Sequence, residues 1–244
     1  MEHEHNTSHS SSADKQPFST PVAIVIAGAL IAGSLLYALG YAPNHLAKSA
    51  PVDTTAEQKQ LKDITPVTDA DHIRGDIKNA ELVMVEYSDL QCPYCSQFHP
   101  VIKKLSSEYG SKVAWVYRQF PLSQIHPQAL PAALASECVA SAKGNEAFWR
   151  FIDGTFVNQQ QIGIALFKKL AAQEGISGPT LDACLAKQDT AKIEAQYNEA
   201  VAAGGQGTPF TVIVDKKGKT VGTFPGAYQY EQAKAQIDAL LAAK

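Results

Sequence analysis

The sequence has little excess charge of either sign. Its 244 residues include 21 basic and 24 acidic side chains, which gives a formal net charge of −3. Clusters of basic residues are confined to three lysine pairs, which are typical of solvated helix faces and turns. A basic surface for nucleic acid is therefore not predicted. With 45% hydrophobic residues, the chain is expected to bury one core and to carry a tail outside it.

Cysteine is scarce as well, with four residues in the chain. Cys92 and Cys95 are separated by two residues, whereas Cys138 and Cys184 are each isolated. A zinc site would need a second pair of ligands, and His99, one helical turn after Cys95, still leaves a fourth ligand missing. No metal site is therefore predicted. Redox activity of the Cys92–Cys95 pair is favoured over zinc binding or a purely structural bridge.

Charge is absent from the apolar run Val22–Leu39. At 1.5 Å rise per residue, about 20 such residues cross a hydrocarbon core about 30 Å thick. Residues 21–42 are therefore predicted to form a transmembrane helix, after a polar, disordered tail over residues 1–20. A cleaved signal peptide is the alternative, but the long polar stretch in front and the length of the run favour an uncleaved anchor. Residues 43–70 are predicted to be a linker.

Residues 71–244 have the pattern of one folded α/β domain. Strands are predicted over residues 82–87, 113–120, 211–214 and 219–224, and residues 71–76 form a turn-rich lead-in. Residues 121–204 are rich in Ala, Leu, Gln and Lys, and they predict a block of five helices inserted between strands. The predicted helices cover residues 128–143, 146–156, 162–174, 179–185 and 189–203, with a final amphipathic helix over residues 230–243.

The Cys92–Cys95 pair lies between a predicted strand and a predicted helix. The helix is expected to run to Tyr109 and to end at Gly110. Free backbone N–H groups at a helix start stabilise a thiolate, so Cys92 is predicted to have a low pKa. His99 is expected on the helix surface or in packing, with tuning of the thiolate as the alternative, and His126 is expected in a loop.

Three motifs carry a resemblance to a known family. They are Glu86-Tyr-Ser-Asp-Leu-Gln-Cys92-Pro-Tyr-Cys95, Phe120-Pro-Leu122, and Gly207-Thr-Pro-Phe210. With these separations, the chain from about Asp71 to Leu241 resembles the DsbA-type thiol:disulfide oxidoreductases, in particular their membrane-tethered branch. The resemblance implies a thioredoxin-like fold with an inserted helical subdomain, preceded here by the predicted transmembrane helix.

The resemblance also implies roles for residues around the cysteine pair. Cys92 is expected to be the exposed nucleophile and Cys95 the resolving cysteine, with no cofactor beyond their redox-active disulfide. Pro93 suits the first helical turn, and Tyr94 places an aromatic ring beside the sulfur atoms. Glu86 is expected to lie under the site and to exchange a proton with Cys95; a surface carboxylate is the alternative.

Two further features take their expected roles from the family. The bond between Thr208 and Pro209 is expected to be cis and to lie beside the dithiol, where the backbone of Thr208 would pair with an extended substrate; a plain loop proline is the alternative. Cys138 and Cys184 are expected to form a structural disulfide within the helical block, as in some relatives. Buried free thiols are the alternative for this second pair.

The function that follows is extracytoplasmic introduction of disulfides into exported proteins. The expected partners are reduced or unfolded exported proteins, a membrane partner that reoxidises the dithiol, and the lipid bilayer through residues 21–42. The catalytic domain is expected on the extracytoplasmic side of the cell membrane, where a dithiol stays oxidised. Tyr94 leaves a disulfide reductase or isomerase open. A non-catalytic holdase or scaffold that binds unfolded segments is the alternative from another class.

Overall fold

The computed structural model describes residues 61–243. The predicted tail, the predicted transmembrane helix and most of the predicted linker lie outside these residues. None of the helices between residues 61 and 243 has the length and apolarity that a bilayer crossing needs.

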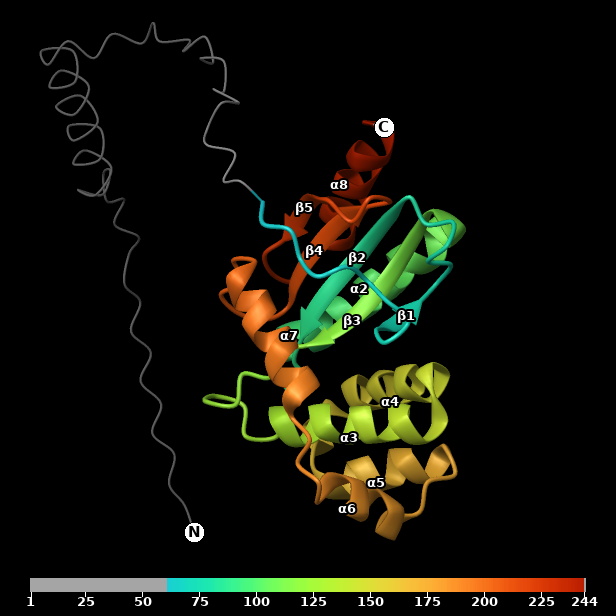
Figure 1. Cartoon of the computed structure of the whole chain (residues 1–244), viewed down its shortest axis with the longest axis vertical. Helices are drawn as coiled ribbons and strands as arrows, with labels where there is room; N and C mark the ends of the chain where they lie inside the picture. The colour runs from blue at the N-terminus through green and yellow to red at the C-terminus, as the bar shows by residue number, and fades with distance from the viewer. Residues whose placement is uncertain (1–60, 244) are drawn as a thin grey trace, which may run out of the picture. The chain divides into compact units, whose positions relative to one another are not determined.

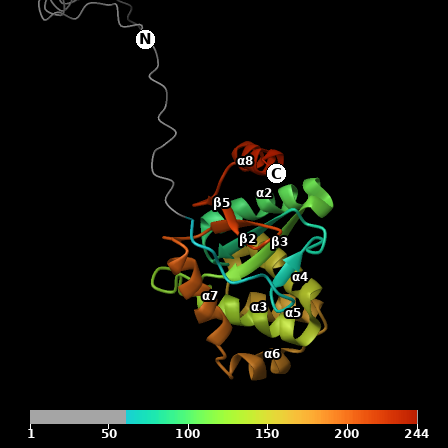
Figure 2. The same ribbon diagram turned by 45° about the horizontal axis from the view of Figure 1, so that its top comes forward.

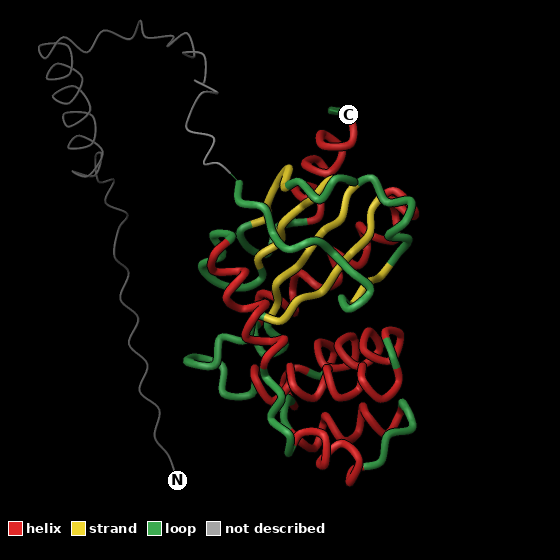
Figure 3. The backbone as a smooth tube through the Cα atoms, in the orientation of Figure 1, coloured by secondary structure: helices red, strands yellow, loops and turns green. Residues whose placement is uncertain are grey.

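A five-stranded mixed sheet forms the centre of the domain, in the order β1-β3-β2-β4-β5 (Figures 1 and 3). The central strand β2 (Leu82–Ser88) is parallel to β3 (Val113–Gln119) and antiparallel to β4 (Phe210–Asp215). The edge strands are β5 (Thr220–Phe224), which pairs with β4, and β1 (His72–Arg74), which pairs with β3. The other predicted strands are confirmed. The interpretation of His72–Arg74 as part of a turn-rich lead-in was wrong, because three residues are too short to show an alternating pattern.

Side chains alternate between the two faces of the sheet. Leu82 and Met84 point to one face, where they pack with α2 (Pro93–Tyr109) and α8 (Tyr230–Ala242). Val83 and Val85 point to the opposite face and belong to a second core cluster that includes Ala200 of α7 (Ala191–Ala202). Figure 2 shows α2 and α8 together on one side of the sheet. All seven residues of β2 are buried because both of its faces are covered.

Four helices of the predicted insertion form a block next to the sheet (Figures 1 and 3). They are α3 (Ala129–Lys143), α4 (Asn145–Val157), α5 (Ile164–Gln173) and α6 (Gly178–Leu185). The fifth predicted helix is α7, which leads back to the sheet. The helices α3, α4 and α5 share one apolar cluster with α2 and the sheet. The block is therefore packed on the domain through a continuous core.

The end of the predicted linker lies against the sheet on the α7 side. Thr220 donates hydrogen bonds from N to Asp63 Oδ1 (2.9 Å) and from Oγ1 to Lys62 O (3.0 Å). Further along, the buried guanidinium of Arg118 on β3 pairs with Asp71 Oδ1 (2.8 Å) and Glu199 Oε2 (2.6 Å). The Arg118 side chain is only 3% exposed, and a buried charge is costly unless it is paired with opposite charges. Residues 62–71 are thus held by ordered contacts, and Figure 1 shows this segment running across the sheet.

Candidate active site

The cysteine pair lies at the carboxyl end of β2, where the chain turns into α2. Cys92 is the N-cap of α2, with extended backbone angles (φ −70°, ψ 123°), and Pro93 occupies the first turn. The turn is closed by a hydrogen bond from Cys92 N to Asp89 O (3.1 Å), and the first helical bond runs from Ser96 N to Cys92 O (3.1 Å). Proline suits this position because its missing N–H would have no partner inside the helix. The sequence Cys-Pro-Tyr-Cys therefore places both sulfur atoms at the start of α2.

The two cysteines differ in burial, but less than expected. Both are free thiols. Cys95 is fully buried, and its sulfur accepts a hydrogen bond from Asp89 N (3.5 Å). Cys92 was expected to be exposed, yet its exposed fraction is only 3%, and Thr208 O lies 3.4 Å from its Sγ atom. Tyr94, between them, is 61% exposed and forms the open side of the site.

The electrostatic environment separates the two thiols. A hydrogen bond from the Cys95 thiol, together with the backbone N–H groups of Cys95 and Tyr94, lowers the pKa of Cys92 to about 6. Burial raises the pKa of Cys95 well above its ordinary value, and the neighbouring charges of Cys92 and Glu86 raise it further. At neutral pH the site therefore holds one thiolate, on Cys92, and one protonated thiol, on Cys95.

Glu86 lies inside the core on the same side of the sheet as α2. Its side chain is fully buried, and Oε2 accepts a hydrogen bond from Trp115 Nε1 (3.0 Å). Tyr117 on β3 and Thr211 on β4 are paired with Glu86 across the sheet and are also buried. Burial raises the pKa of Glu86 to about 7, against an ordinary value of 4.5. The surface-carboxylate alternative is thus excluded by the burial of this strand.

The peptide bond between Thr208 and Pro209 is cis, and Thr208 lies next to the dithiol. The turn joins α7 to β4, so that the site combines residues from both ends of the domain. Beside it lies a cleft of about 420 Å³, whose lining includes Thr208, Pro209, Phe210, Pro225 and Gly226. The structure therefore brings Cys92, Cys95, Glu86 and the Thr208–Pro209 turn together at one end of the sheet.

Asp89, which the sequence interpretation left without a role, holds the loop in front of the dithiol. Its buried carboxylate accepts hydrogen bonds from the backbone N–H groups of Leu122 (2.9 Å) and Gln91 (2.7 Å), and it lies 2.7 Å from His126 Nδ1. His126 is in the loop between β3 and α3, as predicted. The position of Asp89 three residues before Cys92 is the signal that could have identified it.

His99 is buried within α2. Its ring packs against Trp115 and Phe156, and its Nε2 atom lies 2.7 Å from Asp153 Oδ1. Burial lowers the pKa of His99, although the Asp153 carboxylate acts in the opposite direction. Within residues 61–243, no three His, Cys, Asp or Glu side chains are grouped as metal ligands. The packing alternative for His99 is therefore confirmed.

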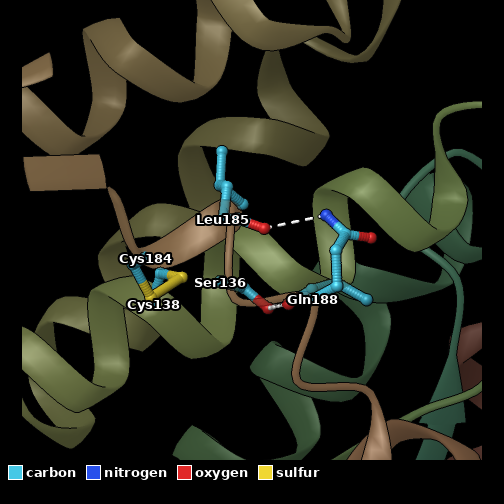
Figure 4. Close-up of a disulfide and its surroundings, with 6 residues drawn as sticks. Ser136, Cys138, Cys184, Leu185 and Gln188 are labelled. Carbon is cyan, nitrogen blue, oxygen red and sulfur yellow. Dashed lines mark hydrogen bonds between the residues drawn. A yellow bond between two sulfur atoms is a disulfide. The ribbon is translucent and has the colours of Figure 1, made fainter. Parts of the chain in front are cut away.

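The second cysteine pair is joined by a disulfide in the helical block. Cys138 of α3 and Cys184 of α6 have an S–S distance of 2.01 Å and a Cα–Cα distance of 5.9 Å. Figure 4 shows the bond between the two helices, close to the turn in which Gln188 Nε2 donates to Leu185 O (2.8 Å). The bridge closes a sequence separation of 46 residues. It ties the last helix of the block to the first.

Comparison with known proteins gives the family. A sequence model described as thioredoxin matches residues 67–239. The structure is similar to α-DsbA1 of Wolbachia pipientis, with a TM-score of 0.63 and 24% identity, over 73% of this chain and 94% of that one. It is also similar to the catalytic domain of Proteus mirabilis ScsC, with a TM-score of 0.59 and 26% identity, over 72% and 91% of the two chains. The chain belongs to the thioredoxin family, and its fold is similar to that of DsbA-type thiol:disulfide oxidoreductases.

A curated relative has a different overall size. The chain is 35% identical over 135 residues to a protein of Mycolicibacterium gilvum named Na(+)/H(+) antiporter NhaA 1. The match covers 55% of this chain and 21% of that protein. The chain thus spans about a fifth of the length of this relative.

Proposed function

We propose that the chain is an extracytoplasmic oxidase that introduces disulfides into exported proteins through its Cys92-Pro93-Tyr94-Cys95 dithiol. The observation that carries the proposal is the contrast between Cys92, whose pKa is lowered to about 6, and the fully buried thiol of Cys95. A stabilised Cys92 thiolate stabilises the reduced enzyme. The disulfide form then becomes the stronger oxidant, since every 30 mV corresponds to about 1.4 kcal/mol for this two-electron couple.

The oxidation proceeds by two thiol–disulfide exchanges. In the first, a substrate thiolate attacks Cys92 Sγ in the oxidised enzyme. The Cys92–Cys95 bond breaks, and the Cys95 sulfur leaves with the electron pair. In the second, another substrate thiolate attacks the substrate sulfur of the mixed disulfide and releases Cys92 as a thiolate. The substrate loses two electrons and the enzyme dithiol gains them, with no cofactor other than the redox-active disulfide.

Glu86 supplies the proton that Cys95 takes up. The Cys95 sulfur leaves into a fully buried position, where a thiolate is unstable. Glu86 is also fully buried, and its pKa of about 7 keeps it in equilibrium between the acid and the carboxylate near neutral pH. In the reverse direction, the carboxylate accepts the proton from Cys95 when this residue resolves a mixed disulfide formed at Cys92.

Substrate segments bind through their main chain beside the dithiol. Thr208 and Pro209 occupy a turn with a cis bond, and the adjacent cleft of about 420 Å³ leaves room for an extended segment. Backbone pairing with Thr208 selects unfolded chains and is largely independent of their sequence. The exposed ring of Tyr94, held at the helix start by Pro93, gives the bound segment an apolar contact.

The proposed location is the extracytoplasmic side of the cell membrane. The support from the sequence is the uncharged run Val22–Leu39, from which we infer a single anchor over residues 21–42. The Cys138–Cys184 bond supports an oxidising compartment, because such bonds are rare where thiols are kept reduced. A membrane electron-transfer partner then accepts the two electrons and restores the Cys92–Cys95 disulfide.

The test is a trap for mixed disulfides in the full-length protein. Cys95→Ala removes the resolving thiol, and we expect it to accumulate covalent complexes with exported proteins that contain cysteine pairs. The matched control, Cys92→Ala, is expected to form none. If Cys92→Ser retained full activity in cells that lack the wild type, the oxidase proposal would be wrong and the holdase role would be favoured.

A further inference from the structure

The segment that follows α4 reaches from the helical block to the dithiol loop. Asn158 ends α4: its backbone N (3.1 Å) and its Nδ2 atom (2.7 Å) both donate to Gly154 O. The next three residues, Gln159–Gln161, form a single 3-10 turn. Gln160 and Gln161 are exposed, whereas Gln159 is only partly exposed and faces the loop that leads into α2.

The carboxamide of Gln159 binds both sides of this loop. Its Nε2 atom donates to Leu90 O (3.0 Å) and to Cys92 O (3.0 Å), so that each of its two N–H groups has a carbonyl partner. The carbonyl of Cys92 also accepts the first hydrogen bond of α2, from Ser96 N. Gln159 therefore holds the backbone on either side of Gln91 at the point where the loop becomes a helix.

A second contact joins the same two elements. Ser96 Oγ, in the first turn of α2, donates to Phe156 O near the end of α4 (3.4 Å). The C-terminal end of α4 is thus attached to the start of α2 by contacts on both sides of Cys92. The backbone orientation of Cys92 is therefore defined by the helical insertion as well as by its own helix.

We propose that Gln159 is a positioning residue through which the helical insertion sets the reactivity and the reduction potential of the Cys92–Cys95 dithiol. A thiolate at a helix start is stabilised only while its sulfur stays close to the free N–H groups of the first turn. The Cys92 side chain makes no capping hydrogen bond to α2, and its Sγ atom contacts Thr208 O (3.4 Å), so the position of the sulfur relative to the helix start depends on the backbone of Cys92 and on this contact. The two bonds from Gln159 hold that backbone. Without them, Cys92 moves away from the N–H groups and its thiolate is less stable.

The inference rests on the proposed redox function of Cys92. A purely structural role for Gln159, as a link between the helical block and the sheet, predicts a loss of stability with an unchanged dithiol. The positioning role instead predicts a change in the chemistry of Cys92 in a protein that is still folded. The two roles are distinguished by measurements on the dithiol.

The experiment compares the full-length wild type with Gln159→Ala and Gln159→Glu, and with the matched controls Gln160→Ala and Gln161→Ala. The Gln159→Glu change keeps the shape of the side chain but replaces the donor by an acceptor facing two carbonyl oxygens. Three properties are measured: the equilibrium with glutathione, the thiolate absorbance of Cys92 against pH, and unfolding by urea.

Both Gln159 variants are expected to be about tenfold weaker oxidants in the glutathione equilibrium, which corresponds to about 30 mV. The midpoint of the Cys92 titration is expected to rise, more in Gln159→Glu than in Gln159→Ala, while the controls match the wild type. Folded Gln159 variants with wild-type equilibrium and titration would overturn the proposal. If the wild type itself showed no redox activity at Cys92, the proposed function would be refuted instead. The failure of the Gln159 proposal and the failure of the proposed function can therefore be told apart.

Discussion

Trp115 Nε1 donates a hydrogen bond of 3.0 Å to Glu86 Oε2 inside the core of the domain. Both side chains are fully buried, and they come from the two neighbouring parallel strands at the centre of the sheet. Neutral donors of this kind offset only part of the cost of burying a carboxylate. Glu86 therefore keeps a raised pKa, as the proposed proton exchange with Cys95 near neutral pH requires.

Glu86→Gln is expected to change how stability depends on pH. The pKa of Glu86 is about 7 in the folded chain and 4.5 ordinarily, so between these values the folded state binds more protons than the unfolded state. The contribution of Glu86 to the free energy of unfolding thus falls as pH rises from about 4.5 to 7, by about 3 kcal/mol. Urea unfolding of the wild type and of Glu86→Gln at pH 4 and pH 8 measures this loss as the difference between the two proteins. The variant should not show it, and equal pH dependence in both proteins would contradict the account.

The same substitution is expected to slow the resolution of mixed disulfides. Without a carboxylate at position 86, the proton of Cys95 has no buried acceptor, and the rate should lose its increase near pH 7. Stopped-flow measurement of resolution between pH 5 and pH 9 tests this. Glu231→Gln, at an exposed position in α8, is the control. An unchanged rate and an unchanged pH profile in Glu86→Gln would exclude the proton-transfer role.

The reactivity of Cys92 should depend on Cys95. Alkylation of the reduced wild type is expected to increase with pH around a midpoint of about 6, where Cys92 becomes a thiolate. Because the Cys95 thiol makes the largest contribution to this low pKa, Cys95→Ala should shift the midpoint upward. Mass spectrometry of iodoacetamide-treated protein identifies the modified residue. A midpoint in the ordinary thiol range for the wild type would contradict the assignment of Cys92 as the nucleophile.

Removal of the second disulfide is expected to lower stability without abolishing exchange at the dithiol. Cys138→Ser with Cys184→Ser releases a loop closed over 46 residues, which should cost about 2–4 kcal/mol of unfolding free energy. Urea unfolding measures the loss, and thiol counting under denaturing conditions checks the bond itself. Two free thiols at these positions in the oxidised wild type would show that the bridge does not form.

Much of the fold could be predicted from the sequence because its patterns are local. The apolar run over residues 82–87 and the glycine at the end of α2 are both visible within a few residues. The strand β1 was missed because its pairing with β3 depends on residues about 40 positions away. The packing of residues 62–65 on the sheet was missed for the same reason, since their partners Thr220 and Glu199 lie far along the chain.

The site was predictable to a similar extent. Cys92, Cys95 and the Thr208–Pro209 turn were identified through motifs. The small exposed fraction of Cys92 was not, because it depends on how close Thr208 O approaches the sulfur. Gln159 gave no signal, since a run of three glutamines between two helices has the composition of an ordinary loop. Its contact with Cys92 exists only once the helical block is packed beside α2.

The reduction potential of the Cys92–Cys95 pair tests the central claim most directly. The full-length protein is equilibrated with glutathione buffers, and the fraction of reduced Cys92 is measured after acid quenching. The oxidase proposal predicts a potential near that of strong oxidants, about −120 mV. A value near that of thioredoxin, about −270 mV, would contradict the oxidase function and would identify the protein as a reductant.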